Sequence, residues 1–364
     1  MPHAVMHRLP MSAPDDVSAL AAAIAAGTLD PASVVAVLGK TEGNGCVNDF
    51  TRGFAVQSLK LLFSRHIAPD RVDAIAFVMS GGTEGGLGPH WLVVEARAGD
   101  HAATGPSLAV GVAATRSLLP EEIGRVAQVD AVAAAVAAAM AKAGIAAAED
   151  VHFVQIKCPL LTAERILEAR GRGASTATAE TLKSMGLSRG ASALGVAVAL
   201  GEVARDAIDD RAIGVDKTLW SGRASTSAGV ELMVVEIMVL GMSAAWSGDL
   251  AIDHAVMADG IDVEPVRAAL RRLGFDAAGQ LSTDEQARLR ALLVKAEASS
   301  TGRLRHHRHT MLDDSDISST RHARAFVAGA LAGVVGHAEI FVSGGAEHQG
   351  PDGGGPCAVI ARKA

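Results

Sequence analysis

One three-part pattern occurs three times in this chain of 364 residues, and it constrains the fold more than any other feature. Each copy holds an apolar segment ending in Lys, then an Arg after a hydroxyl residue, then a Ser four positions before a Glu. In chain order the copies are Lys40, Arg52, Ser80; Lys157, Arg189, Ser227; and Lys295, Arg321, Ser343. Because chance rarely repeats such an order, we expect three structural repeats in one chain.

The segments between these landmarks mix strand and helix patterns in every third of the chain, which predicts an α/β fold. Strands are expected at 34–40, 75–80, 91–97, 107–113, 151–157, 230–241, 338–343 and 357–362. Helices are expected at 15–26, 51–65, 127–143, 162–171, 189–204, 263–273, 284–295 and 320–335. Linker-like stretches at 98–106 and 245–256 divide the chain into units 1–104, 105–248 and 249–364.

Composition excludes several classes of protein. Hydrophobic residues make up 49% of the chain and charged residues 20%, which excludes intrinsic disorder. The net charge is -7 without a basic block, so we expect no nucleic-acid partner. The apolar run 131–141 is too short for a bilayer, which needs ~20 residues, so no membrane association is expected. Three cysteines without a Cys-x-x-Cys pair (Cys46, Cys158, Cys357) and no signal-peptide pattern favour the cytoplasm.

The recurring residue types suit acyl chemistry on a small planar ligand. Ser becomes a nucleophile when a neighbouring base takes its proton, and a buried Lys among other cations has a lowered pKa and can be that base. Small residues after each Ser can expose backbone N–H groups to a developing oxyanion. Three Arg side chains suit a small ligand with several carbonyl oxygens. The pattern therefore predicts one pocket shared by three repeats.

Four longer segments resemble the cyanuric acid hydrolase/barbiturase family, and the resemblance extends over essentially the whole chain. They are GKTEGNGCVND at 39–49, FVMSGGTEG at 77–85, SRGASALG at 188–195 and SGGAEHQGP at 343–351. The likeness is nearer to the cyanuric acid hydrolases than to barbiturase. It implies three repeats around a pseudo-three-fold axis, with a barrel-like core and helices outside.

The resemblance also implies hydrolytic opening of the s-triazine ring of cyanuric acid to carboxybiuret, which loses CO2 to give biuret. One alternative within the family is hydrolysis of barbiturate to ureidomalonate. A second alternative, from another class of protein, is a non-catalytic binder of small cyclic imides. Retained Ser–Lys pairs argue against this last alternative, because binding alone needs no amine of lowered pKa.

Residue roles follow from the resemblance, position by position. The working dyad is Ser227 with Lys157, with Ser225 and Thr226 as weaker candidates for the nucleophile. The substrate-binding set is Arg52, Ser80, Gly81, Arg189, Ala228, Ser343 and Gly344, together with the other two lysines, Lys40 and Lys295. Two residues compete as the third substrate arginine: Arg321 fits the internal repeat, and Arg324 fits the family spacing and is favoured.

The middle repeat departs from the other two, because it reads Ser-Ala-Gly where they read Ser-Gly-Gly, and the segment before its Ser, 222–226, is polar. A metal site is implied by the resemblance, with Glu297 as carboxylate and backbone oxygens from the Gly-rich tail. The tail residues are Ala346, Gln349, Gly350, Pro351 and Gly354. One carboxylate with several carbonyls suits a structural Mg²⁺ or Ca²⁺. The resemblance also implies a homotetramer.

Overall fold

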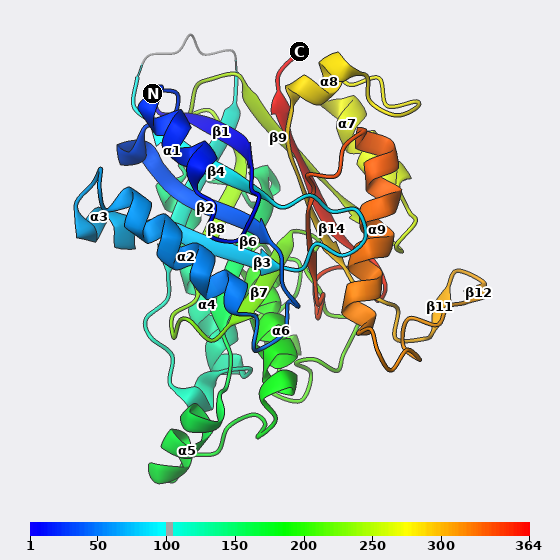
Figure 1. Cartoon of the computed structure of the whole chain (residues 1–364). Helices are drawn as coiled ribbons and strands as arrows, with labels where there is room; N and C mark the ends of the chain where they lie inside the picture. Colours follow the sequence, from blue (N-terminus) through cyan, green and yellow to red (C-terminus); the bar gives the residue numbers. More distant parts are fainter. Residues whose placement is uncertain (100–104) are drawn as a thin grey trace.

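The computed structural model describes residues 1–99 and 105–364, and it is an α/β protein built on three four-stranded mixed sheets (Figure 1). The first sheet holds β1 (His3–Pro10), β2 (Val34–Thr41), β3 (Ala76–Gly81) and β4 (His90–Arg97). The second holds β5 (Ser107–Ala114), β6 (Val151–Pro159), β7 (Ala224–Gly229) and β8 (Glu236–Ser243). The third holds β9 (Leu250–Met257), β10 (Leu289–Ala296), β13 (Phe341–Gly344) and β14 (Gly355–Arg362).

All three sheets have the same topology. Numbering the strands of each sheet in chain order, the spatial order is first, fourth, second, third. The second and third strands are parallel and the other pairs antiparallel. Even the register shift at the start of the second strand recurs in each sheet. The expected α/β fold with three structural repeats is therefore confirmed, while the boundaries after 104 and 248 stay predictions.

Helices cover the outside of the sheets. In each repeat one long helix leads from the second strand to the third, as parallel neighbours require a crossover: α2 (Phe50–Phe63), α6 (Thr181–Ala199) and α9 (Ser319–Val335). The remaining α-helices are α1 (Ser18–Ala25), α3 (Pro69–Asp73), α4 (Val126–Lys142), α5 (Ala163–Gly171), α7 (Glu264–Arg272) and α8 (Thr283–Arg288). None of the helices in the described ranges is both long and apolar enough to cross a membrane.

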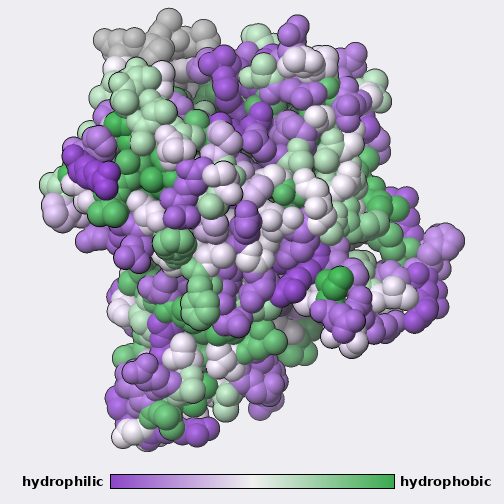
Figure 2. Space-filling view, in the orientation of Figure 1, coloured by the Kyte–Doolittle hydropathy of each residue, from purple (hydrophilic) through white to green (hydrophobic). Residues whose placement is uncertain are grey.

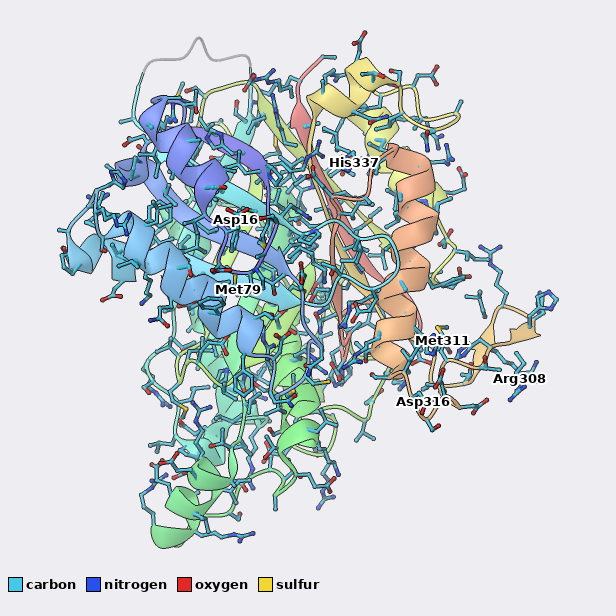
Figure 3. All side chains as sticks on the ribbon, viewed as in Figure 1. Asp16, Met79, Arg308, Met311, Asp316 and His337 are labelled. Carbon is cyan, nitrogen blue, oxygen red and sulfur yellow. The ribbon has the colours of Figure 1, made fainter. Side chains whose placement is uncertain are left out.

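The third strands of the three sheets, β3, β7 and β13, contact one another at the centre of the molecule. One apolar core joins all three sheets there, with members such as Val78, Ile156 and Phe341. On the face shown in Figure 2, hydrophobic residues are scattered among hydrophilic ones. A small hairpin of β11 (Arg303–Leu304) and β12 (His307–Arg308) lies outside the three four-stranded sheets, and Figure 3 labels Arg308 on it and Met311 and Asp316 on the chain that follows.

Several predicted elements are wrong in type or extent. The helix expected over 284–295 ends at Arg288, and the buried apolar run that follows forms β10. The polar segment 222–226 enters the buried strand β7, and the linker 245–256 overlaps β9. The strand expected from 230 begins at Glu236, and β1 was not predicted. Within the predicted linker 98–106, residues 100–104 lie outside the described residues.

Candidate active site

The parallel strand pairs set the Lys and Ser of each repeat side by side. Lys40 is the register partner of Ser80, Lys157 of Ser227, and Lys295 of Ser343. The three pairs sit at the same level of three equivalent sheets, whose third strands meet at the centre. The recurring pattern of the sequence is thus a spatial arrangement of three Ser–Lys pairs facing one another.

One central cavity collects most of the predicted substrate residues. It is lined by Arg52, Ser80, Gly81, Arg189, Ser227, Ala228, Arg324, Ser343 and Gly344, together with Gly45, Met79 and Met185, which were not predicted. All three lysine side chains are buried behind it. The cavity residues come from all three repeats, so the site is incomplete without any one of them.

In the first and third repeats, each lysine donates to its own serine. Lys40 Nζ lies 3.3 Å from Ser80 Oγ, and Lys295 Nζ lies 3.2 Å from Ser343 Oγ. Burial lowers the pKa of Lys40 well below its usual range, and the charge of Arg324 lowers it further. Burial lowers the pKa of Lys295 to about 7, with the charge of Arg189 acting in the same direction. Near neutral pH the Lys295 amine can therefore exist without a proton.

The middle repeat is arranged differently. Lys157 Nζ forms a 2.8 Å ion pair with Glu231 and donates to the Met79 carbonyl at 3.3 Å; Met79 is labelled on β3 in Figure 3. Ser227 Oγ shares a 3.1 Å hydrogen bond with Ser343 Oγ. Within residues 1–99 and 105–364, Lys157 makes no hydrogen bond to Ser227. Burial lowers the pKa of Lys157, and Glu231 opposes that shift.

The arginines that face the cavity come from the three crossover helices. Arg52 lies in the first turn of α2, whereas Arg189 lies well inside α6, which starts eight residues earlier than the helix expected at 189. On α9, Arg324 is buried and lines the cavity. Arg321 is 31% exposed, donates to the Asn44 carbonyl, and lines the wider opening outside. The geometry therefore favours Arg324 over Arg321 as the third substrate arginine.

The glycine after Ser80 has a local steric reason. A Cβ on Gly81 would overlap the carboxylate of Asp49. That carboxylate accepts from the Thr51 N–H and caps α2, and it also accepts from the Gly45 N–H at 2.8 Å. In the middle repeat, Ala228 takes the equivalent place, and its carbonyl accepts from Arg52 at 3.0 Å.

The predicted metal carboxylate lies in a setting that fits a hard cation. Glu297 is half-buried and accepts from the N–H groups of Ala298 at 2.9 Å and Ala346 at 3.3 Å. Burial and the nearby Glu347 raise its pKa, and among the described residues it has no ion-pair partner. Desolvation and the charge of Glu347 outweigh the opposing charge of Arg189, so a bound cation would lower the cost of keeping the Glu297 carboxylate ionised.

The tail residues predicted as metal ligands divide into two groups. Ala346, Gly350 and Pro351 line one cavity together with Glu297. Gln349 and Gly354 belong to the same loop but do not line that cavity, and the Gln349 side-chain oxygen accepts from the Thr226 N–H at 2.7 Å.

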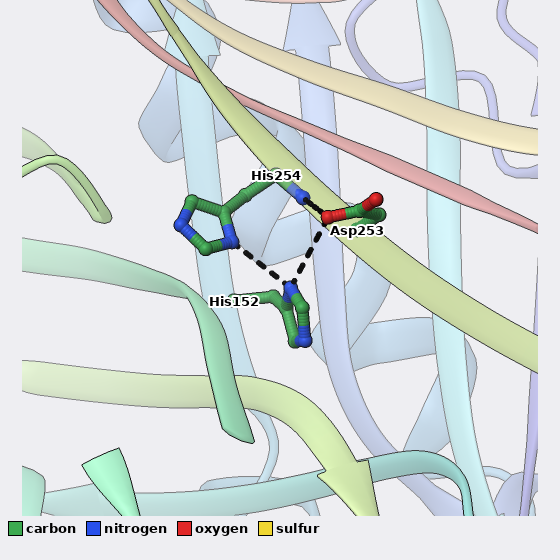
Figure 4. A group of neighbouring side chains, drawn as sticks. All are labelled: His152, Asp253 and His254. Carbon is green, nitrogen blue, oxygen red and sulfur yellow. Dashed lines mark hydrogen bonds and ion pairs between the residues drawn. The ribbon is translucent and has the colours of Figure 1, made fainter. Parts of the chain in front are cut away.

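A second group of titratable side chains lies away from the cavity, between β6 and β9 (Figure 4). His152 Nδ1 lies 2.9 Å from His254 Nδ1, and Asp253 lies 3.7 Å from His152. The second oxygen of Asp253 is held by Arg272 at 2.5 Å. Burial lowers the pKa of His254 to about 4, helped by the charge of His152. Because a guanidinium already balances Asp253, this group acts as a polar junction between the second and third sheets.

Three buried Ser–Lys pairs and three guanidinium groups, drawn from three equivalent repeats, meet at this one cavity. The chain belongs to the ring-opening amidohydrolases, since the family model described as "Amidohydrolase ring-opening protein" matches residues 5–362. The resemblance found in the sequence is therefore confirmed.

Curated relatives named cyanuric acid amidohydrolase match over nearly full length. That of Bradyrhizobium sp. (strain ORS 375) is 63% identical, covering 98% of this chain and 97% of the relative. That of Azorhizobium caulinodans is 62% identical, covering 100% and 99%. The solved cyanuric acid hydrolase from A. caulinodans superposes with a TM-score of 0.93 over 100% of both chains, at 62% identity. A second solved cyanuric acid hydrolase, 50% identical, gives 0.94 over 100% of both chains.

Proposed function

We propose that this chain is a cyanuric acid amidohydrolase, which opens the s-triazine ring by hydrolysis to carboxybiuret, with loss of CO2 to biuret. The observation that carries the proposal is the cavity itself, where three equivalent Ser–Lys pairs and three guanidinium groups meet. A ring with three carbonyls and three N–H groups presents the same pattern three times over. A three-fold set of hydrogen-bonding groups matches it on every side.

The middle pair performs the chemistry in this proposal. Lys157 accepts the proton of Ser227, whose Oγ attacks one ring carbonyl carbon, and the C–N bond to the ring nitrogen breaks as that nitrogen takes the proton back. Water then replaces Ser227 at the carbonyl carbon and releases carboxybiuret. Ser80 with Gly81 and Ser343 with Gly344 hold the other two carbonyls, and the buried arginines stabilise negative charge as it develops.

The decisive experiment is a Ser227→Ala substitution with mass spectrometry of cyanuric acid incubated with the protein. We expect wild-type enzyme to produce biuret and the variant to lose activity by about 10⁴-fold or more, as removal of a covalent nucleophile does. Unimpaired turnover by the variant contradicts the proposal, and parallel incubation with barbiturate tests the barbiturase alternative. If the wild-type protein binds cyanuric acid tightly without consuming it, the result supports the alternative of a non-catalytic binder of cyclic imides.

The same proposal includes a structural Mg²⁺ or Ca²⁺, a homotetramer and a cytoplasmic location. Glu297 and backbone oxygens of the loop 346–354 would hold the ion, which supplies positive charge that ties this loop near Ser343. The half-buried carboxylate of Glu297, whose pKa is raised by desolvation and by the nearby Glu347, supports the metal. The free thiols of Cys46, Cys158 and Cys357 fit a reducing compartment.

A further inference from the structure

The Glu that lies four residues after each Ser has a regular partner in two of the three repeats. Glu84 of the first repeat holds Arg324 of the third through the Nε and one terminal nitrogen, at 2.8 and 2.5 Å. Glu347 of the third repeat holds Arg189 of the second in the same way, at 2.8 and 2.7 Å. Each pair crosses a repeat boundary, so the Glu of one repeat orients the substrate arginine of another.

By the same three-fold rule, Glu231 of the second repeat should hold Arg52 of the first, yet it does not. Glu231 instead forms the 2.8 Å ion pair with Lys157 of its own repeat. Arg52 donates to the backbone carbonyls of Ala228 and Cys46. The Arg52 Nε is buried and has no hydrogen-bond partner in the described part of the chain. The atom left over is therefore the one that binds Glu in both of the other pairs.

The backbone of the middle repeat explains the difference. Gly82 and Gly345, two residues after their serines, have φ values of +102° and +75°, so the chain turns sharply there. Gly229 has no positive φ, and β7 continues through it. The Glu231 carboxylate therefore folds back over Gly229, where a Cβ would overlap it. Arg165 of α5 fixes the loop by donating to the carbonyls of Val230 and Leu232.

The middle repeat, whose Glu differs in its partner from the other two, holds the Ser227–Lys157 pair that reacts in the proposed function. We propose that Glu231 is a positioning residue with two alternative partners, which holds the Lys157 ammonium away from Ser227 in the empty enzyme and passes to Arg52 when substrate binds. The exchange gives the unsatisfied Arg52 Nε–H a hydrogen-bond acceptor, and it releases Lys157 to accept the Ser227 proton. The inference rests on the proposed function, because it explains how the Ser227–Lys157 pair becomes reactive.

The charges around Lys157 fit this exchange. Glu236 on β8 is its register partner, and burial raises the pKa of that carboxyl to about 7, so near neutral pH it supplies only part of a negative charge. Arg52 and the buried Cys158 thiol are the other titratable groups that face Lys157. Glu231 is thus the main group that keeps Lys157 protonated, and its departure removes that opposing negative charge from beside the amine.

The first test is the pH dependence of a Glu231→Gln variant, with Glu84→Gln as matched control. The profile of kcat/KM reports groups of the free enzyme and that of kcat reports the enzyme–substrate complex. We expect Glu231→Gln to move the acid limb of kcat/KM to lower pH by about one unit or more, the usual effect of one opposite charge, and to move the limb of kcat much less. Glu84→Gln should raise KM and leave both limbs in place.

A Glu231→Gln variant whose kcat/KM limb stays at the wild-type pH overturns the inference, as does an equal shift in the control. The second test is a crystal structure of the Ser227→Ala variant soaked with cyanuric acid. The Glu231 carboxylate is expected within hydrogen-bonding distance of Arg52 Nε, and a carboxylate still on Lys157 beside bound substrate rejects the exchange. A separate result tests the proposed function itself: a Ser227→Ala enzyme that still hydrolyses cyanuric acid would show that the proposed function is wrong.

Discussion

Arg321 and Arg324 lie one turn apart on α9, and only Arg324 is placed to contact a ligand in the central cavity. Arg324 is 4% exposed and bidentate to Glu84, whereas Arg321 makes one hydrogen bond to a backbone carbonyl near the surface. We expect Arg324→Lys to lower kcat/KM by about 10- to 100-fold, since Lys cannot reproduce the fork and each charged hydrogen bond is worth ~1.5–3 kcal/mol.

Arg321→Lys serves as the matched control, and we expect its kcat/KM within about 3-fold of wild type because surface contacts contribute ~1 kcal/mol or less. Steady-state kinetics on cyanuric acid measures both variants. The opposite ranking would show that the arginine named by the internal repeat is the substrate ligand.

For single residues, the sequence predicts which side chains come together at the cavity, but it does not predict which of them form hydrogen bonds or ion pairs with one another. The order of Lys, Arg and Ser identified the three serines and two of the three arginines that line the cavity, because equivalent strands place equivalent residues together, whereas Arg324 came from the family resemblance. The partners of Glu84, Glu231 and Glu347 were not predicted, although the Ser–Glu spacing was visible. Two of these contacts cross repeat boundaries, and the third depends on a φ angle at Gly229 that a Gly-rich sequence leaves open.

Replacing a helical glycine with alanine is expected to stabilise or destabilise the protein, depending on what packs against that glycine. Gly329 of α9 is exposed, and a Cβ there would meet nothing within 4 Å. Gly195 of α6 packs against α4, where a Cβ would lie 2.7 Å from Val132 Cβ. We expect Gly329→Ala to stabilise the protein by about 1 kcal/mol through helix propensity. We expect Gly195→Ala to destabilise it by ~1–3 kcal/mol through overpacking.

Thermal unfolding of both variants beside wild type measures the two effects, with the far-UV helix signal as a check on folding. Equal shifts in the same direction would mean that the close approach of α4 and α6 does not set the tolerance for a side chain at Gly195.

Element type was predicted well where periodicity is long, as in α4 and α9, and poorly where an apolar run is short. The run that forms β10 has a length that suits either a strand or the last turns of a helix. Its pairing with β13 and β14 decides the matter, and these partners lie about 50 to 70 residues away. In the buried strand β7, the Thr226 N–H donates to the Gln349 side chain at 2.7 Å and the Thr226 hydroxyl donates to the Arg189 carbonyl at 3.1 Å, and local sequence does not reveal these distant partners.

For the molecule as a whole, the proposed metal ties the C-terminal loop to the third sheet. We expect chelation by EDTA to lower the melting temperature and added Mg²⁺ or Ca²⁺ to restore it, because an ion that binds only the folded state stabilises it by ~2.7 kcal/mol at 100 times its Kd. Glu297→Gln should remove the response, and Glu149→Gln, at an exposed position, should keep it. Elemental analysis that finds no bound ion, with no effect of EDTA, contradicts the metal proposal.

The proposed homotetramer needs a surface that a second copy can cover, and α2 presents one. Phe50, Phe54 and Leu61 lie on one helical face, 83%, 51% and 58% exposed, opposite the buried face of the same helix. An outward apolar stripe of this kind is typical of a protein interface. We expect sedimentation of wild type at four times the subunit mass and of Leu61→Glu at a lower mass, because association would bury the new charge.

The matched control is Leu167→Glu, which changes a similarly exposed leucine on α5 and should leave the mass unchanged. A monomeric wild type contradicts the tetramer itself. A tetrameric Leu61→Glu variant beside a dissociated Leu167→Glu variant moves the interface from α2 to α5. Because α2 carries Arg52 at its first turn, dissociation at the α2 face should also weaken substrate binding. Measuring KM and the sedimenting mass of the protein over a series of protein concentrations tests this link, since KM should rise as the mass of the assembly falls.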